Sequence, residues 1–141
     1  MSNKTEIGLL LARVVLGAIM LTHGIDKFMN MDMVVGMFTD MFELPAFLAY
    51  VTAIIEVVAG ISLILGLFVE ISAALLGLVM MGAMVTVKFQ LGFFGNGQMA
   101  GWELDLALLG LAFVLTFGGS RLFALSSIIG KDSSAVDHRV A

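Results

Sequence analysis

Ionisable residues lie inside apolar runs of this chain that are long enough to cross a membrane. Arg13 falls within the apolar run 7–20, and Glu56 falls within the run 46–67. An ionisable side chain in hydrocarbon costs about 2.5–3.5 kcal/mol on insertion scales, so it usually faces a partner or a site. Because these charges have opposite sign, we expect the two helices to meet and Arg13 to pair with Glu56 and orient it. The pair could equally be a structural ion pair that fixes helix register.

Further polar residues lie at the ends of the apolar runs. His23 and Lys27 follow the first run, Lys88 follows the third, and Glu103 opens the last. In an antiparallel arrangement these ends meet on one side of the membrane, which predicts a polar column from Arg13 to the outer rim. Lysine and histidine can polarise a carbonyl or carry a proton, and a carboxylate can accept one. Simpler interpretations remain open, because lysines near helix ends snorkel to the interface and a lone histidine can be structural.

The residues beside these groups are candidates for binding a ligand. Met20 shares a helical face with Arg13, and Met84 shares one with Lys88, so both are predicted to line the column. Trp102 lies next to Glu103 and is predicted to contact a ligand, although an aromatic belt at the interface is the more common role of such a tryptophan. The predicted ligand-binding residues are therefore Arg13, Met20, Met84 and Trp102.

Glu103 and Asp105 point in nearly opposite directions on a helix, so only one of them is expected to face the interior. We expect Glu103 to do so, because the small residues Ala107 and Gly110 continue its face. The predicted catalytic residues are His23, Lys27, Glu56, Lys88 and Glu103.

Several kinds of cofactor site are excluded by residue type. The chain has no cysteine, which removes disulfides, thiolate catalysis, iron–sulfur ligation and thiolate zinc sites. His23 is the one histidine of the apolar region, so paired axial ligands for haem and a histidine zinc site are lacking. The methionines of 29–41 could bind copper(I), but such residues are more often adaptable apolar filling. We therefore predict no metal and no intrinsic redox cofactor.

Composition and hydropathy patterning predict an integral membrane protein. The 141 residues are 60% hydrophobic and 13% charged, with a mean hydropathy of +1.09. About 20 residues span a bilayer as a helix. Four segments of this kind predict an all-α fold, an antiparallel four-helix bundle with a short interfacial helix at 30–43 between the first two helices. The predicted spans are Glu6 to about Gly24, Pro45 to about Phe68, Glu70 to about Val87, and Trp102 to about Phe117.

The distribution of basic residues predicts the orientation. Lys4, Arg121, Lys131 and Arg139 lie on the side of the termini, against Lys27 and Lys88 on the other side. By the positive-inside rule both termini are expected in the cytoplasm, with the first run retained as a span. Residues 1–130 are expected to form a single transmembrane domain, and the polar tail 131–141 is expected to be disordered.

The spacing of these residues resembles that of the DoxX family of small four-helix membrane proteins. The pattern consists of Arg13-x3-Gly17, His23-Gly24-x2-Lys27, Glu56-x3-Gly60 and a last helix that opens at Glu103. The resemblance implies an oxidoreductase. Some members are linked to thiosulfate:quinone oxidoreduction and others to quinone or thiol stress responses, often beside soluble redox partners. The wider superfamily includes vitamin K-dependent carboxylases, in which a lysine deprotonates a quinol.

These observations give a leading hypothesis and two alternatives. The leading one is a membrane oxidoreductase subunit that binds a quinone or quinol near the outer end of the bundle. Lys27 and Lys88 would polarise the ring carbonyl, His23 would carry a proton, and Glu56 or Glu103 would accept it. Segment 30–43 would shield the ring. The alternatives are a non-catalytic membrane anchor for a soluble redox enzyme and a small-molecule or proton carrier. Expected partners are the lipid bilayer, a soluble redox protein and a second copy of the chain; nothing in the sequence indicates nucleic-acid binding.

Overall fold

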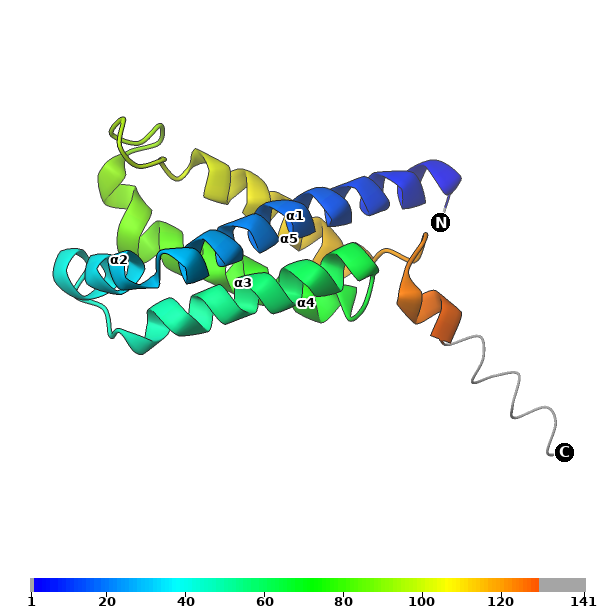
Figure 1. Ribbon diagram of the computed structural model, residues 1–141. Helices are drawn as coiled ribbons and strands as arrows, with labels where there is room; N and C mark the ends of the chain where they lie inside the picture. The colour runs from blue at the N-terminus through cyan, green and yellow to red at the C-terminus, as the bar shows by residue number, and fades with distance from the viewer. Residues whose placement is uncertain (1, 130–141) are drawn as a thin grey trace, which may run out of the picture.

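The computed structural model describes residues 2–129, and this part of the chain is helical, apart from its connecting loops (Figure 1). Within these residues the only β-structure is an isolated bridge between Gly95 and Ala100. The tail predicted for 131–141 lies outside the described residues. The elements are α1 (Asn3–Met29), α2 (Met31–Gly36), the π-helical turn η1 (Met37–Met41), α3 (Phe47–Leu65), α4 (Val69–Ala83), the π-helical turn η2 (Met84–Lys88), the 3-10 turn η3 (Phe89–Leu91) and α5 (Glu103–Gly118).

Three continuous helical segments are long and apolar enough to cross a membrane. They are Asn3–Met29, Phe47–Leu65 and Val69–Leu91, the last of which runs through α4, η2 and η3. The first is longer at both ends than the predicted span 6–24. The hydroxyl of Ser2 accepts a hydrogen bond from the amide of Thr5 and so caps the start of α1. The fourth predicted span corresponds to α5, which has 16 residues.

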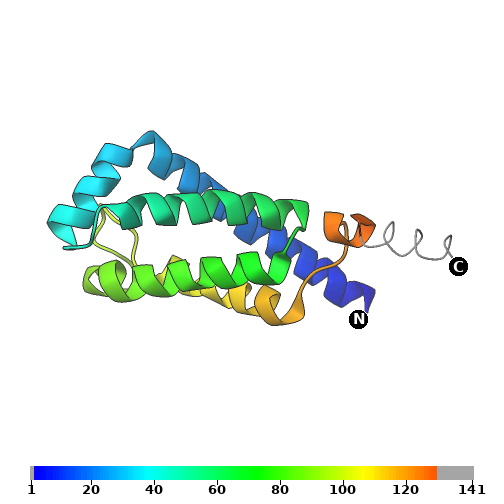
Figure 2. The ribbon, with the colours of Figure 1, turned by 90° about the horizontal axis from the view of Figure 1, so that it is seen from below.

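The long helices lie side by side in both views, with α1 against α3, α3 against α4, α4 against α5, and α5 against α1 (Figures 1 and 2). The start of α1, the turn between α3 and α4, and the end of α5 lie at one end of the molecule. The segment α2–η1 and the loop that follows η3 lie at the other end. Segment 30–43, predicted to form an interfacial helix, thus folds as α2 and η1 beside the ends of the long helices.

Glycines bring α1 and α3 into close contact. A Cβ atom at Gly17 would lie 2.9 Å from the carbonyl oxygen of Gly60, and one at Gly60 would lie 2.9 Å from the amide nitrogen of Leu21. A Cβ atom at Gly24 would lie 2.7 Å from Val57. Small residues permit such close approach of helices in lipid. These contacts fix the register of α1 on α3, and this register determines which polar residues can meet.

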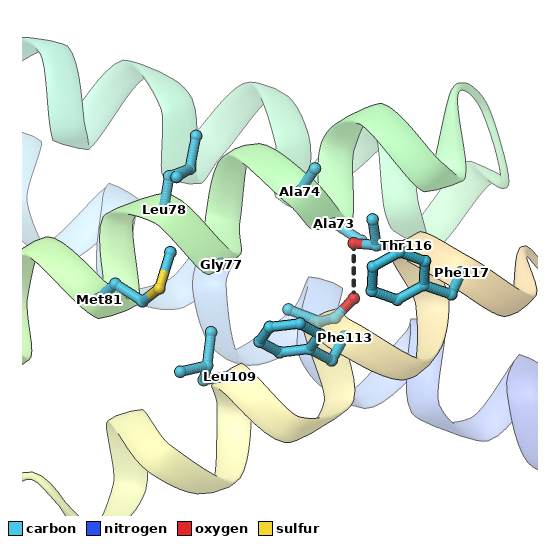
Figure 3. A pocket seen from close by; sticks show the side chains of 10 residues that line it. Ala73, Ala74, Gly77, Leu78, Met81, Leu109, Phe113, Thr116 and Phe117 are labelled. Atoms are coloured by element: carbon cyan, nitrogen blue, oxygen red, sulfur yellow. Dashed lines mark hydrogen bonds between the residues drawn. The ribbon is translucent and has the colours of Figure 1, made fainter.

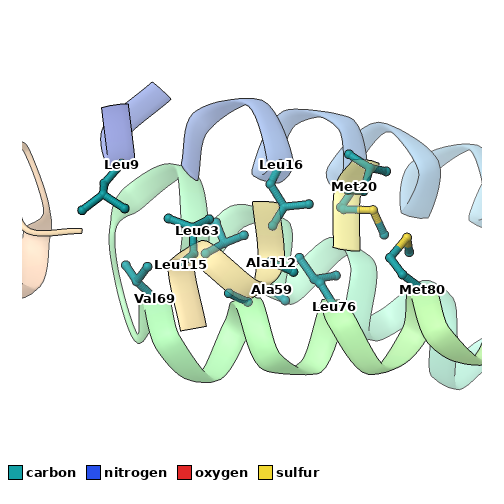
Figure 4. Close-up of a cluster of buried hydrophobic side chains, with 12 residues drawn as sticks. Leu9, Leu16, Met20, Ala59, Leu63, Val69, Leu76, Met80, Ala112 and Leu115 are labelled. Carbon is teal, nitrogen blue, oxygen red and sulfur yellow. The ribbon is translucent and has the colours of Figure 1, made fainter. Parts of the chain in front are cut away.

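The apolar core lies between the four long helices, towards the end that carries the α3–α4 turn (Figure 4). Leu16, Leu63, Leu76 and Leu115 are fully buried there. A tight turn joins α3 to α4. It consists of Gly66–Phe68, and Gly66 adopts a φ of 71°, which glycine tolerates without steric cost.

A small cavity of about 230 Å³ lies between α4 and α5 (Figure 3). Its walls are apolar except for the hydroxyl of Thr116, which donates a hydrogen bond to the carbonyl oxygen of Ala112. No titratable side chain lines this cavity. It therefore has no groups for acid–base chemistry, and the candidate site lies elsewhere.

Candidate functional site

A larger cavity of about 450 Å³ lies between α1, α3, α4 and α5, towards the end that carries α2 and η1. Its volume is within the range of small-molecule binding sites. Most of its wall is apolar, and five titratable residues reach it from four helical segments: His23, Lys27, Glu56, Lys88 and Asp105. A mostly apolar cavity with a few convergent polar groups is the usual form of a ligand site.

Lys27 and Glu56 form the first ion pair of the cavity, through Nζ and Oε1. Lys27 lies three residues after Gly24, whose contact with Val57 holds this part of α1 against α3. Glu56 is 1% exposed, while the side chain of Lys27 is 25% exposed. The second carboxylate oxygen of Glu56, Oε2, is buried and accepts no hydrogen bond from the described residues. An unpaired buried acceptor is costly, so Oε2 favours a ligand that can donate a hydrogen bond.

Lys88 and Asp105 form the second ion pair, with 2.8 Å between Nζ and Oδ2. Asp105 is 5% exposed, and Lys88 lies at the end of the π-helical turn η2. A π-helical turn holds one more residue than an α-helical turn. This widening lets three consecutive residues, Thr86 to Lys88, reach the cavity.

The prediction that Glu103 rather than Asp105 faces the interior is wrong. Glu103 is exposed and does not line the cavity. Ala107 and Gly110, taken as signs of a buried face, are also exposed. The buried face of α5 instead carries Asp105, Leu108, Ala112 and Leu115. Apolar residues occur on both faces of α5, including Leu106, which is 46% exposed, so residue type alone does not distinguish the two carboxylates.

The predicted pairing of Arg13 with Glu56 is wrong as well. Arg13 is 1% exposed, and it donates hydrogen bonds to the carbonyl oxygens of Ser120 at 3.4 Å and Phe123 at 3.2 Å. The register of α1 on α3 places its guanidinium beside Gly66. Glu56 lies ten residues before Gly66, which corresponds to about 15 Å along the helix. Arg13 therefore holds the segment after α5 in place and does not line the cavity.

The remaining predicted residues occupy different places. His23 is exposed on α1 and also lines the cavity, as does the buried Met20. Met84 is buried but is not among the lining residues. Trp102 packs edge-to-face against Phe89 at 5.5 Å and Phe93 at 4.7 Å between ring centroids, outside the cavity.

Segment 37–44 contributes much of the apolar wall at the end of the cavity beside α2 and η1. Met37, Phe38, Phe42 and Leu44 line the cavity from this side, and Met99 reaches it from the loop before α5. The π-helical turn η1 allows the neighbouring residues Met37 and Phe38 to line the cavity together. The segment predicted to shield a ligand thus covers one side of the charged groups. Within residues 2–129, no group of three or more His, Cys, Asp or Glu side chains is placed to hold a metal ion.

Comparison with known proteins identifies the family. The DoxX family model matches residues 8–89, which is more than half of the chain and includes His23, Lys27, Glu56 and Lys88. The chain belongs to the DoxX family. It is 38% identical over 131 residues to a Bacillus subtilis protein named "Putative oxidoreductase CatD", with 93% of each chain covered.

A second relative is a membrane protein. The "Uncharacterized membrane protein Rv3486" of Mycobacterium tuberculosis is 31% identical over 139 residues, covering 90% of this chain and 84% of its own. No solved structure matches the chain. Together with the three apolar helices, these matches establish a membrane protein that contacts the lipid bilayer.

Proposed function

We propose that this DoxX protein is a membrane oxidoreductase subunit that binds a quinone or quinol in the cavity of about 450 Å³. The observation that carries the proposal is the opening of two lysine–carboxylate pairs, Lys27–Glu56 and Lys88–Asp105, onto one apolar cavity. A quinone has polar oxygens on an apolar ring, so it matches a cavity that is apolar except for these groups. The relative named as an oxidoreductase supports the same reaction class.

The two kinds of charged group suit the two redox states of the ring. Reduction of a quinone to a quinol takes up two electrons and two protons. Lysine ammonium groups can donate hydrogen bonds to the quinone oxygens and polarise them, and carboxylates can accept hydrogen bonds and protons from the quinol hydroxyls. The free Oε2 of Glu56 is such an acceptor. The electrons would come from a second substrate or from a soluble partner protein.

His23 would connect the site to the exterior. Its side chain is exposed and also lines the cavity, so it can exchange protons with water and pass them inward. Lys27 and Lys88 would hold the ring oxygens, while Glu56 and Asp105 would accept protons. Met37, Phe38 and Phe42 would exclude water from the ring.

We further propose an antiparallel four-helix bundle in the membrane, with α5 as the fourth span. The 16 residues of α5 extend about 24 Å, and the helix packs on both α4 and α1. The balance of basic residues then places both termini in the cytoplasm and the two lysine–carboxylate pairs near the outer face. Reporter fusions to the N-terminus and to the loop 92–101 test this topology, since the two should report opposite sides.

Quinone binding to the protein in lipid nanodiscs tests the function. Lys27→Met should weaken the binding of a short-chain benzoquinone at least tenfold, because a hydrogen bond from a charged group contributes about 1.5–3 kcal/mol. Glu103→Gln is the matched control and should change the affinity less than about twofold, since Glu103 is exposed.

Equal affinity in wild type and Lys27→Met would contradict the proposal. Retained capture of a soluble redox enzyme in that case would favour the anchor alternative. Transport of a small molecule into proteoliposomes without any redox change would favour the carrier alternative.

A further inference from the structure

The cavity wall between α3 and α4 consists of one residue stripe from each helix. The stripe residues recur at intervals of three or four along each helix, so they share one face. They are Leu48, Thr52 and Ile55 on α3, Leu75, Leu78, Val79 and Gly82 on α4, and Thr86 on η2, which continues α4.

This wall is open to the outside of the protein. Leu75 is 41% and Leu78 is 60% exposed although both line the cavity, and Gly82 and Thr86 are also exposed. The buried apolar residues of α3 that belong to the core, Ala59 and Leu63, lie nearer to the turn. The two helices thus pack closely near their turn, and further along they border a lateral opening.

The opening faces the hydrocarbon of the bilayer. Both α3 and the α4 segment are candidate membrane spans. The outward residues beside the opening are apolar and exposed, including Val51 at 40%, Val58 at 59% and Val85 at 67%. Residues that are apolar and exposed on a spanning helix contact acyl chains. The cavity therefore has a charged interior and a side that opens towards lipid.

Gly82 keeps this opening wide. A Cβ atom at Gly82 would meet nothing within 4 Å, so close helix packing does not require glycine here. Its position contrasts with Gly17, Gly24 and Gly60, where an added Cβ would collide with the neighbouring helix. A large side chain at position 82 can therefore enter the opening without a clash at its Cβ.

We propose that the opening between α3 and α4 holds the hydrocarbon tail of a lipid-soluble quinone, whose ring lies between the two lysine–carboxylate pairs. This inference rests on the proposed quinone function and specifies its substrate class. The ligand enters sideways from the bilayer, and its tail lies along the α3 and α4 stripes beside Gly82.

Two quinones with the same ring test the role of the tail. One carries a prenyl tail and the other a methyl group, and both are titrated against the protein in lipid nanodiscs. Gly82→Phe should weaken the binding of the prenylated quinone at least tenfold. Displacing two buried methylene groups of the tail costs more free energy than a tenfold loss of affinity represents. The affinity for the methyl quinone should change less than about twofold.

Gly110→Phe is the matched control, because Gly110 is exposed on α5, does not line the cavity and also has nothing within 4 Å of an added Cβ. It should leave both affinities unchanged. An unchanged affinity of Gly82→Phe for the prenylated quinone would overturn the inference. An equal loss for both quinones would overturn it too, because the phenylalanine would then act on the ring.

A photoactivatable phospholipid separates failure of the inference from failure of the quinone function. Nanodiscs that contain a phospholipid with a diazirine near the end of its acyl chain should give labelling at Thr52 and Val79, and the prenylated quinone should reduce it. Labelling confined to outward residues such as Val58 would overturn the lateral opening. Labelling at Thr52 that no quinone reduces, in a protein that binds neither quinone, would overturn the quinone assignment and indicate a phospholipid chain in the opening.

Discussion

Replacing Lys27 by methionine removes the charge that compensates Glu56 while it keeps the length and apolar stem of the side chain. Glu56 is 1% exposed, and Lys27 is its ion-pair partner within the described residues. Removing one member of a buried ion pair costs about 3–5 kcal/mol, because the other charge remains buried and uncompensated. Since the side chain of Lys27 is 25% exposed, we expect the lower limit, about 3 kcal/mol of the free energy of unfolding.

The double variant Lys27→Met/Glu56→Gln separates the ion pair from general damage to packing. It leaves no uncompensated charge, so it should be less destabilised than the sum of the two single variants. We expect a coupling energy of about 2 kcal/mol between the two positions, within the range measured for residues in direct contact.

Reversible unfolding in mixed micelles, followed by the fluorescence of the single Trp102, provides the measurement. Glu103→Gln serves as the control and should change the free energy of unfolding by less than about 0.5 kcal/mol, because Glu103 is exposed. The reasoning is refuted if Lys27→Met costs no more than this control, or if the effects at Lys27 and Glu56 simply add.

Three further predictions concern other parts of the molecule. Arg13→Met should remove two charge-assisted hydrogen bonds, each of which contributes about 1.5–3 kcal/mol. Amide hydrogen exchange in residues 120–124 should therefore become faster. Unchanged exchange would show that Arg13 does not hold this segment. Gly60→Ala should destabilise the protein by about 1–3 kcal/mol through overpacking, whereas Gly110→Ala should stabilise it by up to about 1 kcal/mol. Chemical denaturation measures both changes in the free energy of unfolding. Changes of the same sign would contradict the close contact of α1 with α3. Asp105→Asn should weaken benzoquinone binding at least tenfold, whereas Glu103→Gln should weaken it less than about twofold. A titration that gives the larger loss for Glu103→Gln would contradict the assignment of the Lys88–Asp105 pair to the site.

The helical content and the membrane setting could be predicted from the sequence because both depend on local composition. An apolar run of about 20 residues has few ways to satisfy its backbone except as a spanning helix. The positions of His23, Lys27 and Lys88 at the ends of such runs followed from their numbers along the chain, and these residues do reach one cavity. The spacing of the motif residues was also enough to indicate the DoxX family.

The partners of the charged residues could not be predicted in the same way. Arg13 and Glu56 both lie within apolar runs, but their meeting depends on how far α1 slides along α3. The contact of Gly17 with Gly60 fixes that slide, and it places Lys27 rather than Arg13 beside Glu56. One helical turn of slide moves a side chain about 5.4 Å, which is enough to make or break an ion pair.

The sequence by itself determined that long apolar helices lie in the membrane and which ionisable residues they carry, because the cost of exposing polar groups to hydrocarbon acts on each segment separately. Only the tertiary structure decided that Asp105 faces inward and Glu103 outward, that Glu56 pairs with Lys27, and that α3 and α4 border an opening beside Gly82. In lipid, the outer and inner faces of a helix are both apolar, so hydropathy does not reveal its rotation. That rotation, and the register between helices, come from side-chain packing between segments that are distant in the sequence.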